Sequence, residues 1–302
     1  MNYSDIIGNS EVKEYLSKTV NSNNILHSYL FLGTSGIGKK LIAKAFAKKI
    51  LCLNDKKDDC SCKSCLCFDT ENHPDFFMIN DNGDNIKIDE IRKITEKVIE
   101  KPIISSKKVY IINDCEKMTK EAQNCLLKTL EEPPEFIVII LISSNENLIL
   151  NTIKSRCMKL QFKNISDEEL KKYAIENLEY DNVSENILKT FGGSIQKAIT
   201  LKDNKEKYIN IDLLVEKLEK KDIIDILLDS KIIYDKENIN EILDYLIVSL
   251  YAKSKENPKY ICCIDKVNNA INRLKGNANF DMTIDTMLFK MWEDVNENCY
   301  RN

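Results

Sequence analysis

The residues of this chain that are most clearly suited to binding a ligand form a glycine-rich loop. The loop has the order G-x-x-x-x-G-K, and its defining residues are Gly33, Gly36, Gly38 and Lys39. Glycines let backbone N–H groups turn toward phosphate oxygens, and a lysine beside a helix N-terminus favours anions. The spacing therefore indicates a loop that binds the phosphates of a nucleotide.

The residue after the loop lysine departs from this pattern. A serine or threonine hydroxyl is expected there as a Mg²⁺ ligand, and this chain has Lys40. An ammonium group has no acceptor for a metal and repels a cation. Two interpretations follow, a degenerate nucleotide site or a loop retained only as a turn. The substitution disfavours binding of ATP with Mg²⁺, and hydrolysis still more.

Polar residues follow two further apolar runs, and they extend the same candidate site. A hydrolysing site ends one strand in Asp-Glu, where Asp holds the metal and Glu activates water. This chain has Asn113-Asp114, or Asp114-Cys115 if the register shifts by one residue. Either register leaves the acidic pair incomplete. Ser144 follows the second apolar run and is a further candidate nucleotide-binding residue.

A single arginine lies on a loop in the sequence Ser155-Arg156-Cys157. A lone arginine commonly makes a salt bridge at the protein rim. At this place Arg156 could instead reach the γ-phosphate of a neighbouring subunit. A guanidinium supplied in trans stabilises transition-state charge and is worth on the order of 10³–10⁵ in rate.

Cysteines form the second chemical signal. The chain has 11 cysteines, and five of them are close in sequence, namely Cys52, Cys60, Cys62, Cys65 and Cys67. Four thiolates bind structural Zn²⁺ tetrahedrally, and such a site closes a loop with little apolar content. We favour Cys52, Cys60, Cys62 and Cys65 as the ligands and Cys67 as the spare. A different quartet or a lost site are the alternatives. His73-Pro74-Asp75 is more typical of a turn into a strand than of a zinc ligand.

The elements that must position these residues alternate between strands and helices. Short apolar runs predict buried strands at residues 27–32, 76–79, 109–112, 136–142 and 159–162. Helical apolar faces predict helices within residues 2–24, 41–53 and 88–100, and a further helix that Pro133 and Pro134 stop. Alternation of this kind predicts an α/β domain with a parallel sheet.

The remainder of the chain is predicted to be helical. Ser166 to Glu169 is a capping box that opens a helix through Leu178, and another helix begins at Ile195. Residues 202–207 are a candidate hinge. Three amphipathic helices follow, with apolar faces near residues 239–251, 264–274 and 287–292. They form a bundle core and, in a sharper interpretation, a surface for subunit assembly.

Composition limits the function classes. The chain has 302 residues, 43% of them hydrophobic, and a formal net charge of −4. An acidic chain lacks the basic footprint of a general nucleic-acid-binding protein. The sequence contains no apolar run of about 20 residues, so no membrane span is predicted. The polar N-terminus does not resemble a secretory signal, so a cytoplasmic protein with reduced or metal-bound thiols is expected.

These motifs together resemble the bacterial DNA polymerase III clamp-loader subunits, and most closely the delta-prime type. The resemblance rests on four stretches, namely residues 27–31 with the glycine loop, the cysteine cluster with residues 73–75, residues 124–134, and residues 155–157. They span about residues 1–200. The resemblance implies an AAA+ P-loop-type domain over residues 1–163 with an inserted zinc module at about 52–67. A helical lid over 164–205 and an all-α collar over 206–302 would follow.

The resemblance also implies a function. The family assembles a hetero-pentameric ring, with gamma/tau and delta as the other subunits, and uses ATP to place the sliding clamp on primed DNA. Arg156 corresponds to the family's arginine finger, which acts on a neighbour's ATP, and Cys52, Cys60, Cys62 and Cys65 correspond to its zinc module. The polymerase activity of the holoenzyme resides in another subunit, and no membrane partner is expected.

Three departures separate this chain from the ATPase subunits of the family. They are Lys40 after the loop lysine, Asn113-Asp114 in place of Asp-Glu, and Gln196 in place of the lid arginine. They favour a mostly non-hydrolysing delta-prime-type subunit. An active gamma/tau-like ATPase is the alternative, and a stand-alone zinc-dependent DNA-binding protein is a more remote one that the acidic charge disfavours.

Overall fold

The computed structural model describes most of the chain and divides it into two compact units. The described residues are 3–54, 60–80, 85–178, 188–189, 191–203, 205–236, 238–276 and 278–296. The first unit comprises residues 1–170 with 193–195, and the second comprises residues 171–192 with 196–302. Each unit has its own packed interior and is described by itself.

The first unit is built on one parallel sheet. Its five strands lie in the order β2-β3-β4-β1-β5. Their bounds are β1 Ser28–Leu32, β2 Phe76–Ile79, β3 Lys108–Ile112, β4 Ile137–Ser143 and β5 Met158–Gln161. Every residue of β1, β3 and β4 is buried, as expected for parallel strands covered on both faces. The sequence-predicted strands are confirmed within one residue at each end.

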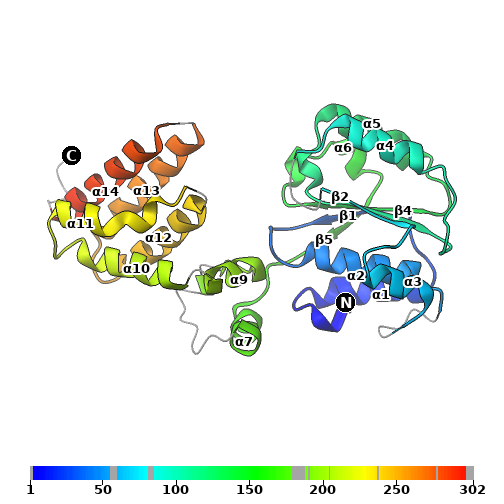
Figure 1. Cartoon of the computed structure of the whole chain (residues 1–302), viewed down its shortest axis with the longest axis horizontal. Helices are drawn as coiled ribbons and strands as arrows, with labels where there is room; N and C mark the ends of the chain where they lie inside the picture. The colour runs from blue at the N-terminus through cyan, green and yellow to red at the C-terminus, as the bar shows by residue number, and fades with distance from the viewer. Residues whose placement is uncertain are drawn as a thin grey trace. The chain divides into compact units, whose positions relative to one another are not determined.

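Helices cover both faces of this sheet (Figure 1). One face carries α1 Ser10–Asn21, α2 Lys39–Leu51 and α3 Lys63–Asp69, and the other carries α4 Ile88–Lys97, α5 Lys120–Glu131 and the short α6 Asn151–Lys154. Successive strand residues point to opposite faces. Phe31 therefore packs into the α1–α2 core and Leu30 into the α4–α5 core. This two-layer covering confirms the predicted α/β class.

Helix boundaries differ from the sequence predictions where the backbone is left-handed. The predicted helix within residues 2–24 is only Ser10–Asn21, because Gly8 and Asn9 have φ values of 72° and 51° that a helix does not allow. The predicted helix over 88–100 ends at Lys97, where the Glu100 N–H bonds to the Lys97 carbonyl in a tighter turn. Thr119 caps α5 by accepting a hydrogen bond from the Ala122 N–H.

A buried network of hydrogen bonds connects the end of α2 to the segment that leads into β3. The Asp75 carboxylate is fully buried and accepts hydrogen bonds from the N–H groups of Ile103, Ile104 and Ser105, at 2.6 to 2.9 Å. The Ser64 and Ser105 hydroxyls both donate to the Leu51 carbonyl at 2.7 Å. These bonds satisfy backbone groups that would otherwise be buried without partners.

In the part that the structure describes, the second unit consists of helices joined by turns. Its helices are α7 Asp167–Leu178, which begins in the first unit, α9 Ile195–Asp203, α10 Lys205–Lys217, α11 Ile223–Asp229, α12 Ile239–Ser254, α13 Tyr260–Lys275 and α14 Phe280–Asn296. The predicted capping box is confirmed, since Ser166 and Glu169 exchange hydrogen bonds at the start of α7. None of the helices in the described ranges has the length and apolar composition that crossing a bilayer requires.

Two predicted apolar faces of this unit, on α12 and on α13, were wrong in part. Tyr251 is 52% exposed, so it lies outside the buried face of α12, which includes Leu250. Of the hinge predicted at residues 202–207, residues 202, 203 and 205–207 are helical, while residue 204 lies outside the described residues. The buried face of α13 is also rotated, with Tyr260, Cys263, Val267 and Ala270 inside. Packing against α12 and α14 decides which side of an apolar helix faces inward.

Candidate nucleotide and metal sites

The glycine loop connects β1 to α2 and requires its glycines. Gly36 and Gly38 have φ values of 78° and 91°, which side-chain-bearing residues rarely adopt. A Cβ atom at Gly33 would lie 2.8 Å from the Phe162 carbonyl oxygen. The predicted loop residues are therefore arranged as in a phosphate-binding turn.

Lys39 is bonded within the loop itself. Its ammonium donates to the carbonyls of Gly33 at 2.5 Å and Thr34 at 2.6 Å, and the side chain is 6% exposed. Burial lowers the pKa of Lys39, and the carboxylates of Glu116 and Asp114 partly oppose that effect. The cation that the sequence assigns to phosphates thus neutralises carbonyl dipoles of its own loop.

The mouth of the loop is bonded to residues that follow β5. The Thr34 hydroxyl donates to the Asn164 side-chain oxygen at 2.5 Å, and the Ile195 N–H donates to the Gly36 carbonyl at 3.1 Å. Gly193 packs so closely on Asn164 that a Cβ atom there would lie 2.5 Å from the Asn164 Cβ. The loop is therefore held by Lys39 from within and by Asn164 and Ile195 from neighbouring segments.

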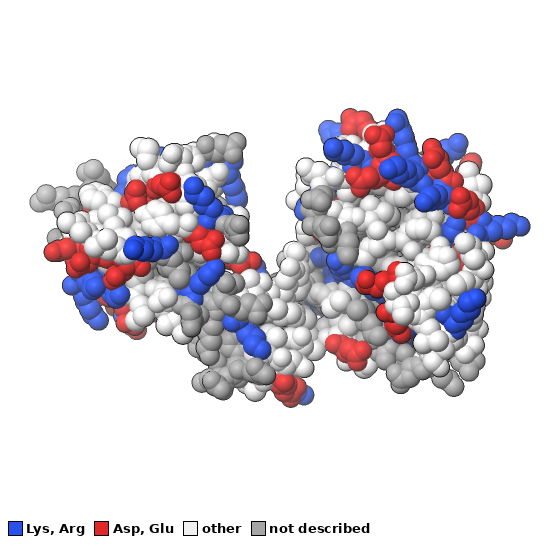
Figure 2. Space-filling model, viewed as in Figure 1, with Lys and Arg blue, Asp and Glu red and all other residues white. Residues whose placement is uncertain are grey.

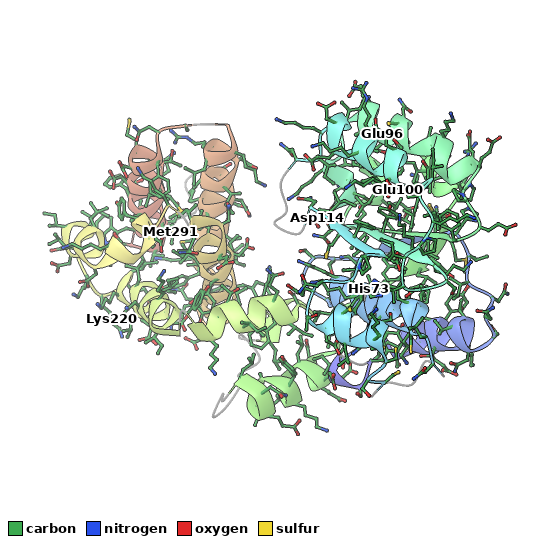
Figure 3. All side chains as sticks on the ribbon, turned by 45° about the vertical axis from the view of Figure 1, so that its right-hand side comes forward. His73, Glu96, Glu100, Asp114, Lys220 and Met291 are labelled. Carbon is green, nitrogen blue, oxygen red and sulfur yellow. The ribbon has the colours of Figure 1, made fainter. Side chains whose placement is uncertain are left out.

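Asn113 and Asp114 follow β3 but make local contacts. The Asn113 and Asn80 side-chain amides each donate to the other's backbone carbonyl, at 3.3 and 3.2 Å. Asp114 has a left-handed φ of 46° and lies 3.7 Å from the Lys117 ammonium (Figure 3). The Asn113 amide group is thus bonded to the residue that follows β2.

Glu116, just beyond Asn113 and Asp114 in the sequence, contacts Ser144. One carboxylate oxygen accepts hydrogen bonds from the N–H of Ser144, at 2.9 Å, and from the Ser144 hydroxyl. The other oxygen is buried without a partner in the described part of the chain. Burial raises the pKa of Glu116, but the Ser144 hydrogen bonds lower it below its usual value. A carboxylate therefore holds Ser144, at the end of β4.

Glu116 was missed because nothing marks it in the sequence. It lies beyond the strand end, and a short 3₁₀ turn over Cys115–Lys117 brings it back toward Ser144. The one sequence feature that could have pointed to Glu116 is its acidic side chain, close after the predicted strand.

Arg156 lies at the edge of the sheet opposite the glycine loop. Its carbonyl accepts a 2.7 Å hydrogen bond from the hydroxyl of Ser28, at the start of β1, and the loop follows the end of β1. Five strand residues rise about 16 Å. The guanidinium pairs with the Glu131 carboxylate at 2.6 Å. Arg156 is therefore remote from the candidate nucleotide site of its own chain.

The four predicted cysteine ligands come together. The sulfur atoms of Cys52, Cys60, Cys62 and Cys65 all lie within 4.8 Å of one another. Cys52 caps the end of α2, Cys62 precedes α3, and Cys65 lies within it. Cys67 is outside the group that the described residues form, as predicted.

The geometry and chemistry of this cluster fit a tetrahedral metal. A zinc ion with Zn–S bonds of 2.3 Å has its sulfur ligands about 3.8 Å apart. The Cys52 and Cys62 sulfurs are 4.0 Å apart. Burial raises the pKa of Cys62, but backbone hydrogen bonds at Cys65 and Leu53 and the neighbouring thiols lower it to about 6. Burial and the thiols of Cys62 and Cys52 raise the pKa of Cys65. The surroundings of the cluster thus favour the thiolate form of Cys62, the form that binds a metal.

His73 is a structural residue beside this cluster (Figure 3). Its Nδ1 accepts a hydrogen bond from the Asp75 N–H at 3.0 Å, so Nε2 carries the proton and lies 2.8 Å from the Ser64 hydroxyl. Burial lowers the pKa of His73, which favours this neutral form, while Asp75 partly opposes the effect. Both ring nitrogens are occupied, in agreement with the turn interpretation.

Comparison with known proteins identifies the class. The fold is that of an AAA+ P-loop domain followed by a helical region. A DNA polymerase III gamma subunit-related protein from Thermotoga maritima has the same fold, with a TM-score of 0.51 and 20% identity over 93% of this chain and 99% of that chain.

The sequence comparisons identify the family. A family model described as DNA polymerase III, delta subunit matches residues 8–166, more than half of the chain. The chain therefore belongs to this family of clamp-loader subunits.

Three curated relatives bear related names. The delta' subunit of Bacillus subtilis is 32% identical over 65% of this chain and 59% of its own length. The tau subunit of the same organism is 33% identical over 71% of this chain and 39% of its own length. The tau/gamma subunit of Haemophilus influenzae is 29% identical over 67% of this chain and 30% of its own length. The chain spans less than two thirds of each relative.

The bonding of Lys39 leads to a stability prediction. Lys39→Met removes both bonds to the loop carbonyls and leaves two acceptors underused, so the free energy of unfolding should fall by about 1–3 kcal/mol without any nucleotide. Urea denaturation measures this change. The exposed Lys93→Met on α4 is the control and should be neutral. Unchanged stability in Lys39→Met would contradict the internal role of Lys39.

Proposed function

We propose that this chain is a delta-prime-type subunit of the DNA polymerase III clamp loader. In this proposal it hydrolyses little or no ATP and supplies Arg156 as an arginine finger to a neighbouring ATPase subunit. The observation that carries the proposal is the position of Arg156 at the sheet edge opposite its own glycine loop. The five residues of β1 between the Arg156 end and that loop rise about 16 Å, and this separation supports a guanidinium that acts on the phosphates of another chain.

The groups around the loop support the non-hydrolysing role. Lys39 already bonds to the loop carbonyls, and Lys40 replaces the hydroxyl that would bind Mg²⁺. The Glu116 carboxylate holds Ser144 and adds a negative charge beside this candidate nucleotide-binding residue, which would repel a phosphate. Gly33, Gly36 and Gly38 keep the turn. In this proposal Asn113 and Asp114 hold no metal.

The proposed partners follow from the relatives' names and from the surface charge. We propose a hetero-pentameric ring with gamma/tau and delta subunits that loads the sliding clamp on primed DNA in the cytoplasm, while another subunit polymerises. Acidic and basic side chains are interspersed on the face in Figure 2. With a net charge of −4, the isolated chain is not expected to bind DNA by itself. In this proposal residues 164–205 are the lid and residues 206–302 the collar.

An active gamma/tau-like ATPase is the alternative. It is favoured by the intact glycine turn and by identities to tau and tau/gamma subunits of 33% and 29%, close to the 32% for delta'. Gln196, in place of a lid arginine, is exposed on α9 and speaks against it.

ATP turnover by the purified chain distinguishes the two functions. The proposal predicts no Mg²⁺-dependent release of phosphate above the no-enzyme rate, because Lys40 replaces the hydroxyl that would bind Mg²⁺ and Asn113-Asp114 replaces the Asp-Glu pair. Binding without turnover, measured by calorimetry, would make the loop a structural nucleotide site. Turnover that Lys39→Ala abolishes would reassign the chain as a motor subunit.

The role of Arg156 is tested in the assembled ring. Arg156→Ala should leave ring assembly unchanged and slow hydrolysis at the adjacent site by on the order of 10³-fold, since the transition-state charge loses its partner. Size-exclusion chromatography, the ATPase rate and clamp loading measure the three effects. Lys159→Ala removes a nearby cation and is the control. Normal clamp loading by Arg156→Ala would remove Arg156 from the mechanism.

We also propose that the four-cysteine cluster binds structural Zn²⁺. The cluster follows the far end of α2, and a 13-residue helix spans about 20 Å, so the metal would be remote from the glycine loop. Zinc would join α2 to α3 beside the Lys48–Asp69 ion pair, whose atoms are 2.8 Å apart. It would supply folding energy to a module with few buried residues.

Elemental analysis and paired substitutions test the metal. The purified chain should contain about one zinc per chain, and Cys62→Ser should lose it and lower the unfolding temperature by roughly 5 °C or more. Cys67→Ser, outside the cluster, should keep both the metal and the stability. A folded, metal-free wild-type chain would rule out the zinc site.

A further inference from the structure

The side chain of Arg156 is held by neighbours from two helices. Nη2 pairs with the Glu131 carboxylate of α5 at 2.6 Å. Nη1 donates to the Thr152 carbonyl of α6 at 2.8 Å and to the Ser155 hydroxyl at 3.3 Å. Together with the Ser28 bond to the Arg156 carbonyl, these contacts hold both the backbone and the guanidinium.

The helix that carries Glu131 also holds the segment before Arg156. Gln123 of α5 donates to the Leu148 carbonyl at 3.0 Å and accepts from the Leu150 N–H at 2.9 Å. Leu150 immediately precedes α6, which leads to Arg156. One rigid helix therefore sets the position of the arginine backbone and offers the carboxylate that orients its side chain.

The ion pair leaves the arginine accessible. The side chains of Arg156 and Glu131 are 33% and 50% exposed. Nη1 donates both side-chain hydrogen bonds that Arg156 makes among the described residues, Nη2 forms the ion pair, and no bond of Nε is found there. Because a guanidinium has five N–H donors in a planar fork, one edge can face the chain while another faces a ligand.

We propose that Glu131 is a positioning residue for Arg156, and this inference rests on the proposed trans-acting role of Arg156. An arginine side chain has considerable rotamer freedom, and a charge that is already oriented loses less of it when the neighbour's phosphates arrive. Glu131 fixes the plane of the guanidinium, with the Thr152 carbonyl as the second anchor. Glu131 itself touches no reacting atom.

The adjacent Glu132 is a matched control. It has the same chemistry and is exposed, but no ion pair of Glu132 occurs among the residues that the structure describes. It caps the end of α5 through its backbone, whose N–H donates to the Lys128 carbonyl, and a substitution of its side chain leaves that bond in place.

The experiment compares four variants of this chain in the ring with its ATPase partners. They are Glu131→Gln, Glu132→Gln, Arg156→Ala and the double variant of Glu131 and Arg156. For a half-exposed pair, kcat for ATP should fall about two- to fivefold in Glu131→Gln while KM stays unchanged. Glu132→Gln should match the wild type. In the Arg156→Ala background, Glu131→Gln should have no further effect, because the group that it orients is absent.

The outcomes separate this inference from the proposed function. If Arg156→Ala has no effect, the trans-acting role fails and the inference fails with it. If Arg156→Ala slows the ring but Glu131→Gln matches the wild type or is faster, only the positioning role fails. An equal loss from Glu131→Gln in both backgrounds would mean a general structural role and would also overturn the positioning role.

Discussion

The parallel direction of all five strands is the constraint on which the two ends of the first unit depend. Parallel strands have their carboxyl ends at one edge, so the glycine loop after β1, Glu116 after β3 and Ser144 after β4 meet there although long segments separate them in sequence. The same constraint puts the start of β1, and with it Arg156, at the opposite edge. One chain therefore presents a glycine-rich loop at one edge of the sheet and an arginine, paired with Glu131, at the other.

The need to satisfy buried polar groups explains the bonding inside the glycine loop. A turn that directs carbonyls inward requires a donor, and Lys39 supplies it at 2.5 and 2.6 Å. The Glu116 carboxylate likewise satisfies the backbone and hydroxyl of Ser144. The loop and Ser144 are thus stabilised by partners within the chain.

Much of the fold and part of the site could be predicted from local patterns. Apolar runs of four to seven residues predicted the ends of every strand to within one residue. The spacing of the cysteines predicted which four of them cluster. Helix ends were less predictable, because Asn9 adopts a left-handed backbone that composition alone does not demand. The choice of Asn113 as a site residue depended on spacing along one strand, whereas its actual partner, Asn80, comes from the neighbouring strand end.

The sequence by itself determined the elements, the turn and the cysteine module, because period, glycine content and ligand spacing are properties of adjacent residues. Only the tertiary structure decided which groups pair across the fold. Glu116 with Ser144, Glu131 with Arg156 and His73 with Ser64 are contacts between different elements. Their geometry depends on strand order and helix packing, which a linear pattern does not contain. The electrostatic character of both sheet edges therefore emerges only after folding.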